Sequence, residues 1–211
     1  MNVSLNHRER ILSAVAKELP SPQILHKQRG QSGDFVLNPI LLDEFPDRQL
    51  QLAAVLIGVV ERDNGPQVIL TRRADHLPKH PGQIALPGGK VDDSDASVTM
   101  AALREAEEEI GLSRRYVEVA GYLDTYETGT GFRVLPVVAF IQPGFELTLN
   151  MGEVAEAFEV PLAFLMNRNN HQLRSDFWGG RERFFYAMPH GRHNIWGATA
   201  GILRQLSEKA F

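Results

Sequence analysis

Three acidic side chains fall on one side of a segment with a helical pattern. Glu108 and Glu109 follow Glu105 by three and four residues, and such neighbours share an arc of roughly 100° on an α-helix. Exposed like charges at this spacing repel one another by about a few tenths of a kcal/mol per pair. Carboxylate oxygens are also ligands that Mg²⁺ and Mn²⁺ prefer. The spacing is therefore typical of either a solvated acidic face or a site for a divalent cation.

The helix that carries these carboxylates is predicted to span residues 95–110. Residues 93–95 (Asp-Ser-Asp) are candidate caps for its first turn, and Gly111 is a candidate left-handed stop. Four residues share a separate arc of roughly 60° that would face the core: Thr99, Leu103, Ala106 and Ile110. We expect Glu107 to point away from the acidic arc, next to Arg104.

A glycine pair, Gly88-Gly89, comes shortly before this helix. Paired glycines mark a tight turn or let the backbone approach a phosphate or a metal ion closely. A P-loop does not fit, because Lys90 is followed by Val91 and Ile84 stands where the first glycine belongs. A dinucleotide-binding glycine fingerprint is also absent from this stretch.

Taken together, the glycine loop and the helix resemble the Nudix box. That family pattern is Gly, five residues, Glu, seven residues, and then Arg-Glu-apolar-any-Glu-Glu-any-Gly-apolar. Gly89 matches its start, and residues 104–112 match its second half without departure. Asp95 stands where the general family has Glu, and eight residues rather than seven separate it from Arg104. These two departures point to a subgroup.

The segment upstream of the box indicates which subgroup. Residues 70–74 (Leu-Thr-Arg-Arg-Ala), Gly82 and residues 87–89 (Pro-Gly-Gly) are similar to the accessory signature of coenzyme A pyrophosphatases of the Nudix superfamily. That subgroup also carries the Asp and the longer spacing. The chain departs from the signature at Pro78, where Arg is expected, and at Leu86, where Phe is expected. An arginine can hold a phosphate through two hydrogen bonds, so its loss is not conservative. The resemblance covers about residues 50–210.

The resemblance implies an enzyme, a diphosphatase in which water attacks one phosphorus of the substrate with Mg²⁺ or Mn²⁺ as cofactor. The implied metal ligands are Glu105, Glu109, Glu108 and the backbone carbonyl of Gly89. The implied proton acceptor is Glu108 or a glutamate from a later loop, with Glu153 as first candidate and Glu156 as second. Arg104 would orient a carboxylate through an ion pair with Glu107 or Glu108. The implied phosphate-binding cations are Arg72, Arg73, Lys79 and His80.

The implied substrate is coenzyme A or a derivative, cleaved to 4′-phosphopantetheine, or its acyl form, and adenosine 3′,5′-bisphosphate. Pro78 and Leu86 keep open a second class of small-molecule substrate, other nucleoside diphosphate derivatives such as ADP-ribose or NADH. A third alternative is a Nudix domain that binds a nucleotide for regulation without hydrolysing it. The intact Arg104 and the three glutamates argue against that alternative, because a binding module has no need of the clustered charge.

The order of elements predicts a mixed α/β fold, a Nudix-type α/β/α sandwich with a mixed β-sheet. Residues 53–60 and 67–71 flank a turn-rich segment and form an expected hairpin. Further strands are expected at 117–124, 133–141, 158–160 and 184–187, with helices around 11–19 and over 197–209. We expect residues 49–211 to form the hydrolase domain. Residues 1–48, a helix and a lead-in, are expected to belong to the same domain.

Composition limits the other classes of protein. Of the 211 residues, 43% are apolar and 23% are charged, as in a globular protein, and the net charge of −4 disfavours nucleic acid as a partner. There is no cysteine, so thiolate metal sites and cysteine nucleophiles are excluded. The apolar run at 52–60 is too short to cross a membrane, and the first ten residues lack the apolar core of a signal peptide. We therefore expect a cytoplasmic protein without a membrane partner, and a homodimer is a further possibility.

Overall fold

The computed structural model describes residues 6–26, 31–44 and 49–211. The α-helices are α1 (His7–Ala14), α2 (Pro22–His26), α3 (Ile40–Glu44), α4 (Val98–Ile110), α5 (Leu162–Met166) and α6 (Gly197–Ala210). The first strands are β1 (Ser32–Gly33), β2 (Gln51–Val60), β3 (Gln67–Arg73), β4 (Ile84–Ala85), β5 (Gly88–Lys90) and β6 (Val117–Tyr122). The later strands are β7 (Tyr126–Glu127), β8 (Phe132–Ile141), β9 (Val154–Pro161), β10 (Gln172–Trp178), β11 (Arg181–His190) and β12 (His193–Trp196). Short 3-10 turns cover Asp34–Val36, Arg114–Tyr116 and Arg168–Asn170.

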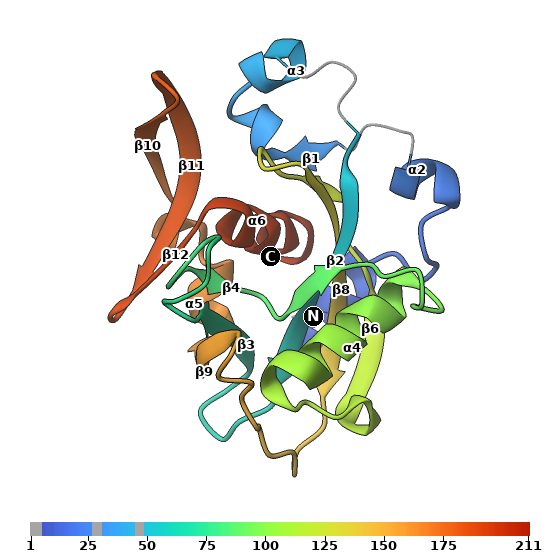
Figure 1. Ribbon diagram of the computed structural model, residues 1–211. Coiled ribbons are helices and arrows are strands. Elements are labelled where there is room, and N and C mark those ends of the chain that lie inside the picture. Colours follow the sequence, from blue (N-terminus) through green and yellow to red (C-terminus); the bar gives the residue numbers. More distant parts are fainter. Residues whose placement is uncertain (1–5, 27–30, 45–48) are drawn as a thin grey trace, which may run out of the picture.

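Nine of these strands form one mixed sheet around a parallel centre. Its strand order is β1-β7-β8-β2-β3-β4, while β5 pairs with β2, β6 with β8, and β9 with β3. Strands β2 and β8 are parallel and in register along their full length, from Gln51 opposite Phe132 to Val60 opposite Ile141. Helix α4 packs on one face of this sheet, whereas α1, α5 and α6 pack on the other (Figure 1). The predicted α/β/α sandwich with a mixed sheet is confirmed.

Strand β2 shows why its sequence is apolar almost throughout. Ala54, Leu56 and Val60 belong to the cluster beneath α4, whereas Ala53 and Ile57 belong to the cluster on the opposite face. A central strand that is buried on both faces needs apolar side chains in both directions. Strand β2 therefore forms the middle of the core and positions β5, its antiparallel neighbour, beside helix α4.

The described parts of the first 48 residues pack against the main sheet. Strand β1 pairs in parallel with β7, and Ala16 forms a β-bridge with Tyr122. The half-buried Asp34 carboxylate accepts hydrogen bonds from the Tyr126 hydroxyl at 2.7 Å and from the Gly129 backbone N–H at 2.6 Å. The amino-terminal segment is thereby attached to the turn between β7 and β8.

The hairpin expected from residues 53–60 and 67–71 forms only next to its turn. A second sheet is also present, and most of it was not predicted. Strands β2 and β3 pair at Val59 opposite Val68, after which β3 continues along β9. Strands β10, β11 and β12 form a separate antiparallel sheet, of which only residues 184–187 had been predicted. None of the helices in the described ranges is long and apolar enough to cross a membrane.

Candidate active site

Helix α4 begins three residues later than predicted. Its N-cap is Ser97, whose hydroxyl accepts a hydrogen bond from the Met100 backbone N–H at 3.2 Å. The predicted start at Asp95 is wrong because that carboxylate is engaged by a side chain further along the helix. The C-terminal prediction is confirmed, since Gly111 adopts the left-handed conformation with φ of 70°.

The core face of α4 agrees with the sequence, and the acidic face is more covered than expected. Leu103, Ala106 and Ile110 are buried, and the half-buried Thr99 lies 3.0 Å from the Tyr122 hydroxyl. Glu109 is only 4% exposed. The glycine loop covers this carboxylate, so the acidic arc is not a freely solvated surface.

Arg104 lies at the centre of the polar contacts around the loop and the helix. Its Nε donates to Asp95 Oδ1 at 2.9 Å, and its Nη2 donates to Asp95 Oδ2 at 3.0 Å. Its Nη1 donates to Glu105 at 3.0 Å and to Glu108 at 2.8 Å. Its Nη2 also contacts the Lys90 carbonyl at 3.2 Å. Such a bidentate, charge-assisted arrangement holds both the loop and the two carboxylates in place.

The predicted partner of Glu107, Arg104, is wrong. Glu107 is paired with Arg114 at 3.1 Å, not with Arg104. The predicted contact between Arg104 and Glu108 is present. Sequence reasoning also missed Asp95 as the anchor of Arg104, although its departure from the general family pattern had marked that position.

The two glycines bring the backbone against two of the glutamates. The Gly88 N–H donates to Glu109 Oε2 at 3.1 Å. A Cβ atom built on Gly89 would lie 2.5–2.7 Å from the carboxyl group of Glu105, closer than any side chain tolerates. Position 89 therefore has to be glycine for Glu105 to keep this position.

The loop before β9 supplies a further carboxylate. Glu153 is exposed, receives a hydrogen bond from Asn150 Nδ2 at 3.2 Å, and interacts electrostatically with both Glu105 and Glu109. Glu156 instead lies close to two basic residues, with Arg192 Nη2 at 2.5 Å and His193 Nε2 at 3.3 Å. Burial raises the pKa of Glu156, but the hydrogen bonds from these two residues outweigh it and lower the pKa overall. Glu156 lies in strand β9 and not in a loop as predicted, so of the two candidates only Glu153 lies on the loop and faces the carboxylates of α4.

The electrostatics show an excess of negative charge at this place. Burial raises the pKa of the Glu109 carboxyl to about 8, and the charges of Glu105 and Glu153 act in the same direction. Burial also raises the pKa of Glu105, against the influence of Arg104. Carboxyls with raised pKa values beside one another gain from a cation that neutralises them.

The four basic residues predicted for the substrate occupy different surroundings. Arg72 is engaged by Asp75 at 2.7 Å and lies 3.9 Å from Glu156. Arg73 is half-buried, lowers the pKa of Glu109 through its charge, and has a buried Nε without a hydrogen-bond partner among the described residues. Lys79 and His80 are exposed on the loop between β3 and β4, where His80 Nδ1 lies 3.0 Å from Gln83 Oε1. Arg73 is therefore the one of the four that the fold brings beside Glu109.

The two departures from the accessory signature have different consequences. Leu86 is 3% exposed and belongs to the core cluster around α6. A leucine in place of the phenylalanine of the signature therefore changes the packing of the core. Pro78 is exposed on the loop between β3 and β4, where an arginine would present its guanidinium to solvent. Only the second departure bears on phosphate binding.

The donor set fits a hard divalent cation, although the side chains are not gathered around one point. Within residues 6–26, 31–44 and 49–211, no group of three acidic or imidazole side chains forms a ready-made metal cage. Glu105 and Glu108 both face Arg104 instead. Mg²⁺ requires few protein carboxylates, because water and substrate phosphate complete its shell. Glu105 and Glu109, with Glu108, Glu153 and the Gly89 carbonyl nearby, supply such oxygen donors.

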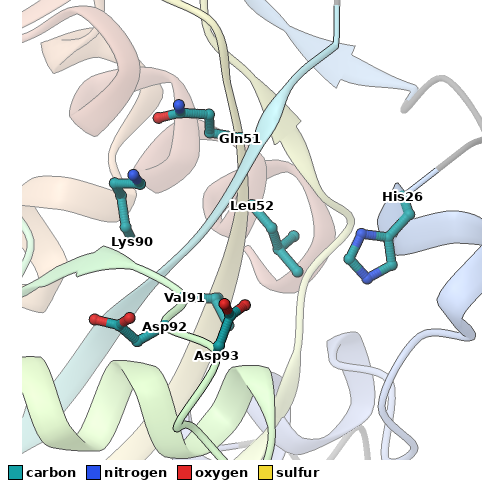
Figure 2. A pocket seen from close by; sticks show the side chains of 7 residues that line it. All are labelled: His26, Gln51, Leu52, Lys90, Val91, Asp92 and Asp93. Carbon is teal, nitrogen blue, oxygen red and sulfur yellow. The ribbon is translucent and has the colours of Figure 1, made fainter.

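A pocket of about 280 Å³ adjoins the same loop from another side. Figure 2 shows its lining residues: His26, Gln51, Leu52, Lys90, Val91, Asp92 and Asp93. None of the α4 glutamates lines it. The pocket is therefore separate from the carboxylate cluster of α4.

Comparison with known proteins identifies the family of this chain. The sequence model of the NUDIX domain matches residues 50–177. A protein of Escherichia coli O1:K1 / APEC, described as the uncharacterized Nudix hydrolase NudL, is 43% identical over 155 residues, which cover 74% of this chain and 80% of that relative. The protein of the same description from Enterobacter sp. (strain 638) is 41% identical over 155 residues, with the same coverage. A solved structure, a NUDIX hydrolase from Alicyclobacillus acidocaldarius, is 19% identical with a TM-score of 0.48, and the match covers 77% of this chain and 93% of that one.

A glycine loop followed by a carboxylate-bearing helix in an α/β/α sandwich thus coincides with the matched domain. The chain belongs to the Nudix family, and it is a Nudix hydrolase.

Proposed function

We propose that this protein hydrolyses the diphosphate bond of coenzyme A or its derivatives with Mg²⁺ or Mn²⁺ as cofactor. The products are 4′-phosphopantetheine, or its acyl form, and adenosine 3′,5′-bisphosphate. The observation that carries the proposal is the cluster of Glu105, Glu109 and Glu153, whose mutual repulsion calls for a cation beside a glycine loop.

A divalent metal ion bound here would polarise the phosphoryl oxygens and stabilise the charge of the leaving phosphate. Glu105 and Glu109 would be its principal ligands, with Glu108 and the Gly89 carbonyl as further oxygen donors from the protein. Arg104 is a positioning residue, because it holds Glu105 and Glu108 through its Nη1 while Asp95 holds the other edge of the guanidinium.

The proton of the attacking water is accepted by a carboxylate at the mouth of the site. Glu153 is the first choice, since it is exposed and faces Glu105 and Glu109 from a different element. Glu108 is the second choice, although its contact with Arg104 competes for the same oxygen atoms. The ion pair of Glu156 with Arg192 and its contact with His193 make it a poor base.

Support for a coenzyme A substrate comes from the segment that resembles the accessory signature. This segment borders the carboxylates, because the Ala74 N–H donates to the Glu153 carbonyl at 2.8 Å and the Gly88 N–H donates to Glu109. Its residue Arg73 would bind a substrate phosphate, with Arg72, Lys79 and His80 adding positive charge around it. Leu86 is buried in the core, so its departure from the accessory signature is no argument against a coenzyme A substrate.

The experiment compares hydrolysis of coenzyme A, ADP-ribose and NADH by the purified protein, with Mg²⁺, with Mn²⁺ and with a chelator. The nucleotide products are separated by chromatography. We expect metal-dependent release of adenosine 3′,5′-bisphosphate from coenzyme A at least about tenfold faster than cleavage of the other two substrates, which is about 1.4 kcal/mol of selectivity. Faster cleavage of ADP-ribose or NADH would contradict the proposal that coenzyme A is the substrate. The protein would then act on other nucleoside diphosphate derivatives, the alternative that Pro78, in place of the expected arginine, keeps open.

A further inference from the structure

In the part of the chain that the structure describes, the second sheet ends in an edge strand, β10, that no further strand covers. All seven residues of β10 are exposed, and its one partner in this sheet is β11. Figure 1 shows the β10–β11 hairpin at one side of the molecule, where it extends beyond helix α6. Leu173, Phe177 and Phe184 are 57%, 70% and 40% exposed, respectively. A long edge with exposed apolar side chains is a template for pairing with another strand.

The direction of the backbone groups on this edge follows from Phe184. Its N–H donates to Asn38 Oδ1 at 2.8 Å, and its carbonyl accepts from Asn38 Nδ2 at 2.9 Å, so both groups point away from β10. Phe184 stands directly opposite Ser175. This pair is therefore a non-hydrogen-bonded one, and the N–H and carbonyl of Ser175 point outward to the free edge. Because every second residue of a strand has the same orientation, the N–H and carbonyl groups of Leu173 and Phe177 also point outward to the free edge.

The sequence of β10 is self-complementary about Ser175. When two copies of the strand pair antiparallel across a two-fold axis at this residue, Leu173 of one copy stands opposite Phe177 of the other, and Arg174 stands opposite Asp176. The apolar pair lies on the face that carries Phe184, and the opposite charges lie on the other face. Residues 174 and 176 then form non-hydrogen-bonded pairs, in which side chains approach most closely.

We propose that the β10 edge is an interface between two copies of this chain, in which the two three-stranded sheets join antiparallel about Ser175. The occupant is a second copy because a two-fold axis at Ser175 matches apolar to apolar and cation to anion at once. In the single chain the Phe177 N–H is accepted by the Asp176 carboxylate at 2.7 Å. In the dimer that N–H is accepted by the Leu173 carbonyl of the other copy, and Asp176 becomes available to Arg174.

The first test measures the molar mass in solution by light scattering over a thousandfold range of protein concentration. We expect a dimer that dissociates on dilution, and a shift to monomer in Arg174→Glu and in Asp176→Arg, each of which places like charges opposite each other. The double variant Arg174→Glu/Asp176→Arg restores opposite charges and should restore the dimer. These residues are exposed, so the hydrolase activity should stay at the wild-type value, as should the melting temperature at concentrations where the wild type is itself a monomer.

A second test uses the absence of cysteine from the chain. Residues 175 of the two copies form a hydrogen-bonded pair, with Cα atoms about 5.5 Å apart, within reach of a disulfide. Ser175→Cys should therefore cross-link into a covalent dimer under mild oxidation. Asp176→Cys is the matched control, because each residue 176 faces residue 174 of the other copy and should cross-link at least about tenfold more slowly.

Two results would overturn the proposal. A wild-type protein that is monomeric at every concentration would leave the edge to a strand of another protein. A dimer that is unaffected by the two charge reversals, with equal cross-linking at positions 175 and 176, would place the interface elsewhere.

Discussion

Asp95 and Arg104 form a bidentate ion pair that connects the glycine loop to helix α4. The two parallel hydrogen bonds, 2.9 and 3.0 Å long, join the carboxylate to Nε and Nη2 of the guanidinium. The hydrogen bonds from Arg104 lower the pKa of Asp95. The side chain is one carbon shorter than the glutamate of the general family pattern, and the loop carries one extra residue, yet both oxygens reach the guanidinium. The two departures from the pattern therefore preserve one structural contact.

We predict that Asp95→Asn weakens both the fold and the activity. The amide keeps the shape but loses the charge that Arg104 requires, and hydrogen bonds to charged groups are worth about 1.5–3 kcal/mol. A loss of about 2 kcal/mol lowers the melting temperature by about 4–8 °C in a domain of this size. Activity should fall further than stability, because Arg104 would no longer hold Glu105 and Glu108 in place. Calorimetry and hydrolysis assays measure the two effects.

Asp93→Asn is the matched control for this variant, since Asp93 is an exposed aspartate of the same loop. We expect it to leave the melting temperature and the activity within error of the wild type. Equal effects of the two substitutions would show that the charge of the loop, and not the bidentate contact, matters.

Gly89→Ala should reduce activity while the fold persists. The new methyl group would meet the carboxyl end of Glu105, a flexible group that can move aside. Displacement of this proposed metal ligand should lower kcat/KM by at least about tenfold, or about 1.4 kcal/mol. Circular dichroism and thermal melting check that the sheet is intact. A fully active Gly89→Ala variant would mean that the position of Glu105 in this structure is not the one used in hydrolysis.

The buried Glu109 predicts how the stability of the metal-free protein depends on pH. Burial raises its pKa from 4.5 to about 8, so the fold favours the protonated carboxyl. This stabilising contribution is fully present below about pH 4.5 and is lost as the pH rises through about 8. Melting temperatures of chelator-treated protein should therefore decline over this range, and Mg²⁺ should stabilise most at the alkaline end.

Glu109→Gln should flatten the decline, because the amide has no proton to lose. The comparison needs melting curves of both proteins with chelator across the same pH series. Parallel curves for the two proteins would indicate that another group is responsible.

Arg73→Ala should weaken substrate binding more than Lys79→Ala. Arg73 lies beside Glu109 with a buried Nε lacking a partner among the described residues, whereas Lys79 is exposed. A half-buried guanidinium next to the proposed metal site can bind a phosphate through two hydrogen bonds. We expect a rise in KM of about tenfold for Arg73→Ala and about twofold for Lys79→Ala. The reverse order would move phosphate binding to the exposed loop.

The sequence contained much of the fold and of the site. The apolar run of β2, the left-handed stop at Gly111 and the core face of α4 all follow from local patterns, and the structure confirms them. The start of α4 did not follow, because Asp95 is engaged by Arg104 nine residues away, a contact that capping rules do not include. The partner of Glu107 was missed for a similar reason, since Arg114 lies beyond the helix end.

Two features could not be predicted from the sequence: the burial of part of the acidic face of helix α4, and the second sheet formed by β10, β11 and β12. A helical projection gives the angle between Glu105 and Glu109 but not the surface that packs over each of them. Glu109 is buried because the Gly88 backbone lies against it. All residues of strand β10 are exposed, including the apolar Leu173, Phe177 and Trp178, so the strand is defined by its pairing with β11 and not by a buried face.

The Mg²⁺- or Mn²⁺-dependent hydrolysis of coenzyme A should be compared between the wild type, Glu109→Gln and Glu107→Gln. Glu109 is a proposed metal ligand beneath the glycine loop, whereas Glu107 is exposed and paired with Arg114. The account predicts metal-dependent turnover by the wild type, near-complete loss in Glu109→Gln with the fold retained, and nearly unchanged turnover in Glu107→Gln, because exposed ion pairs contribute little. Equal loss in both variants, or turnover that persists with chelator, would contradict it.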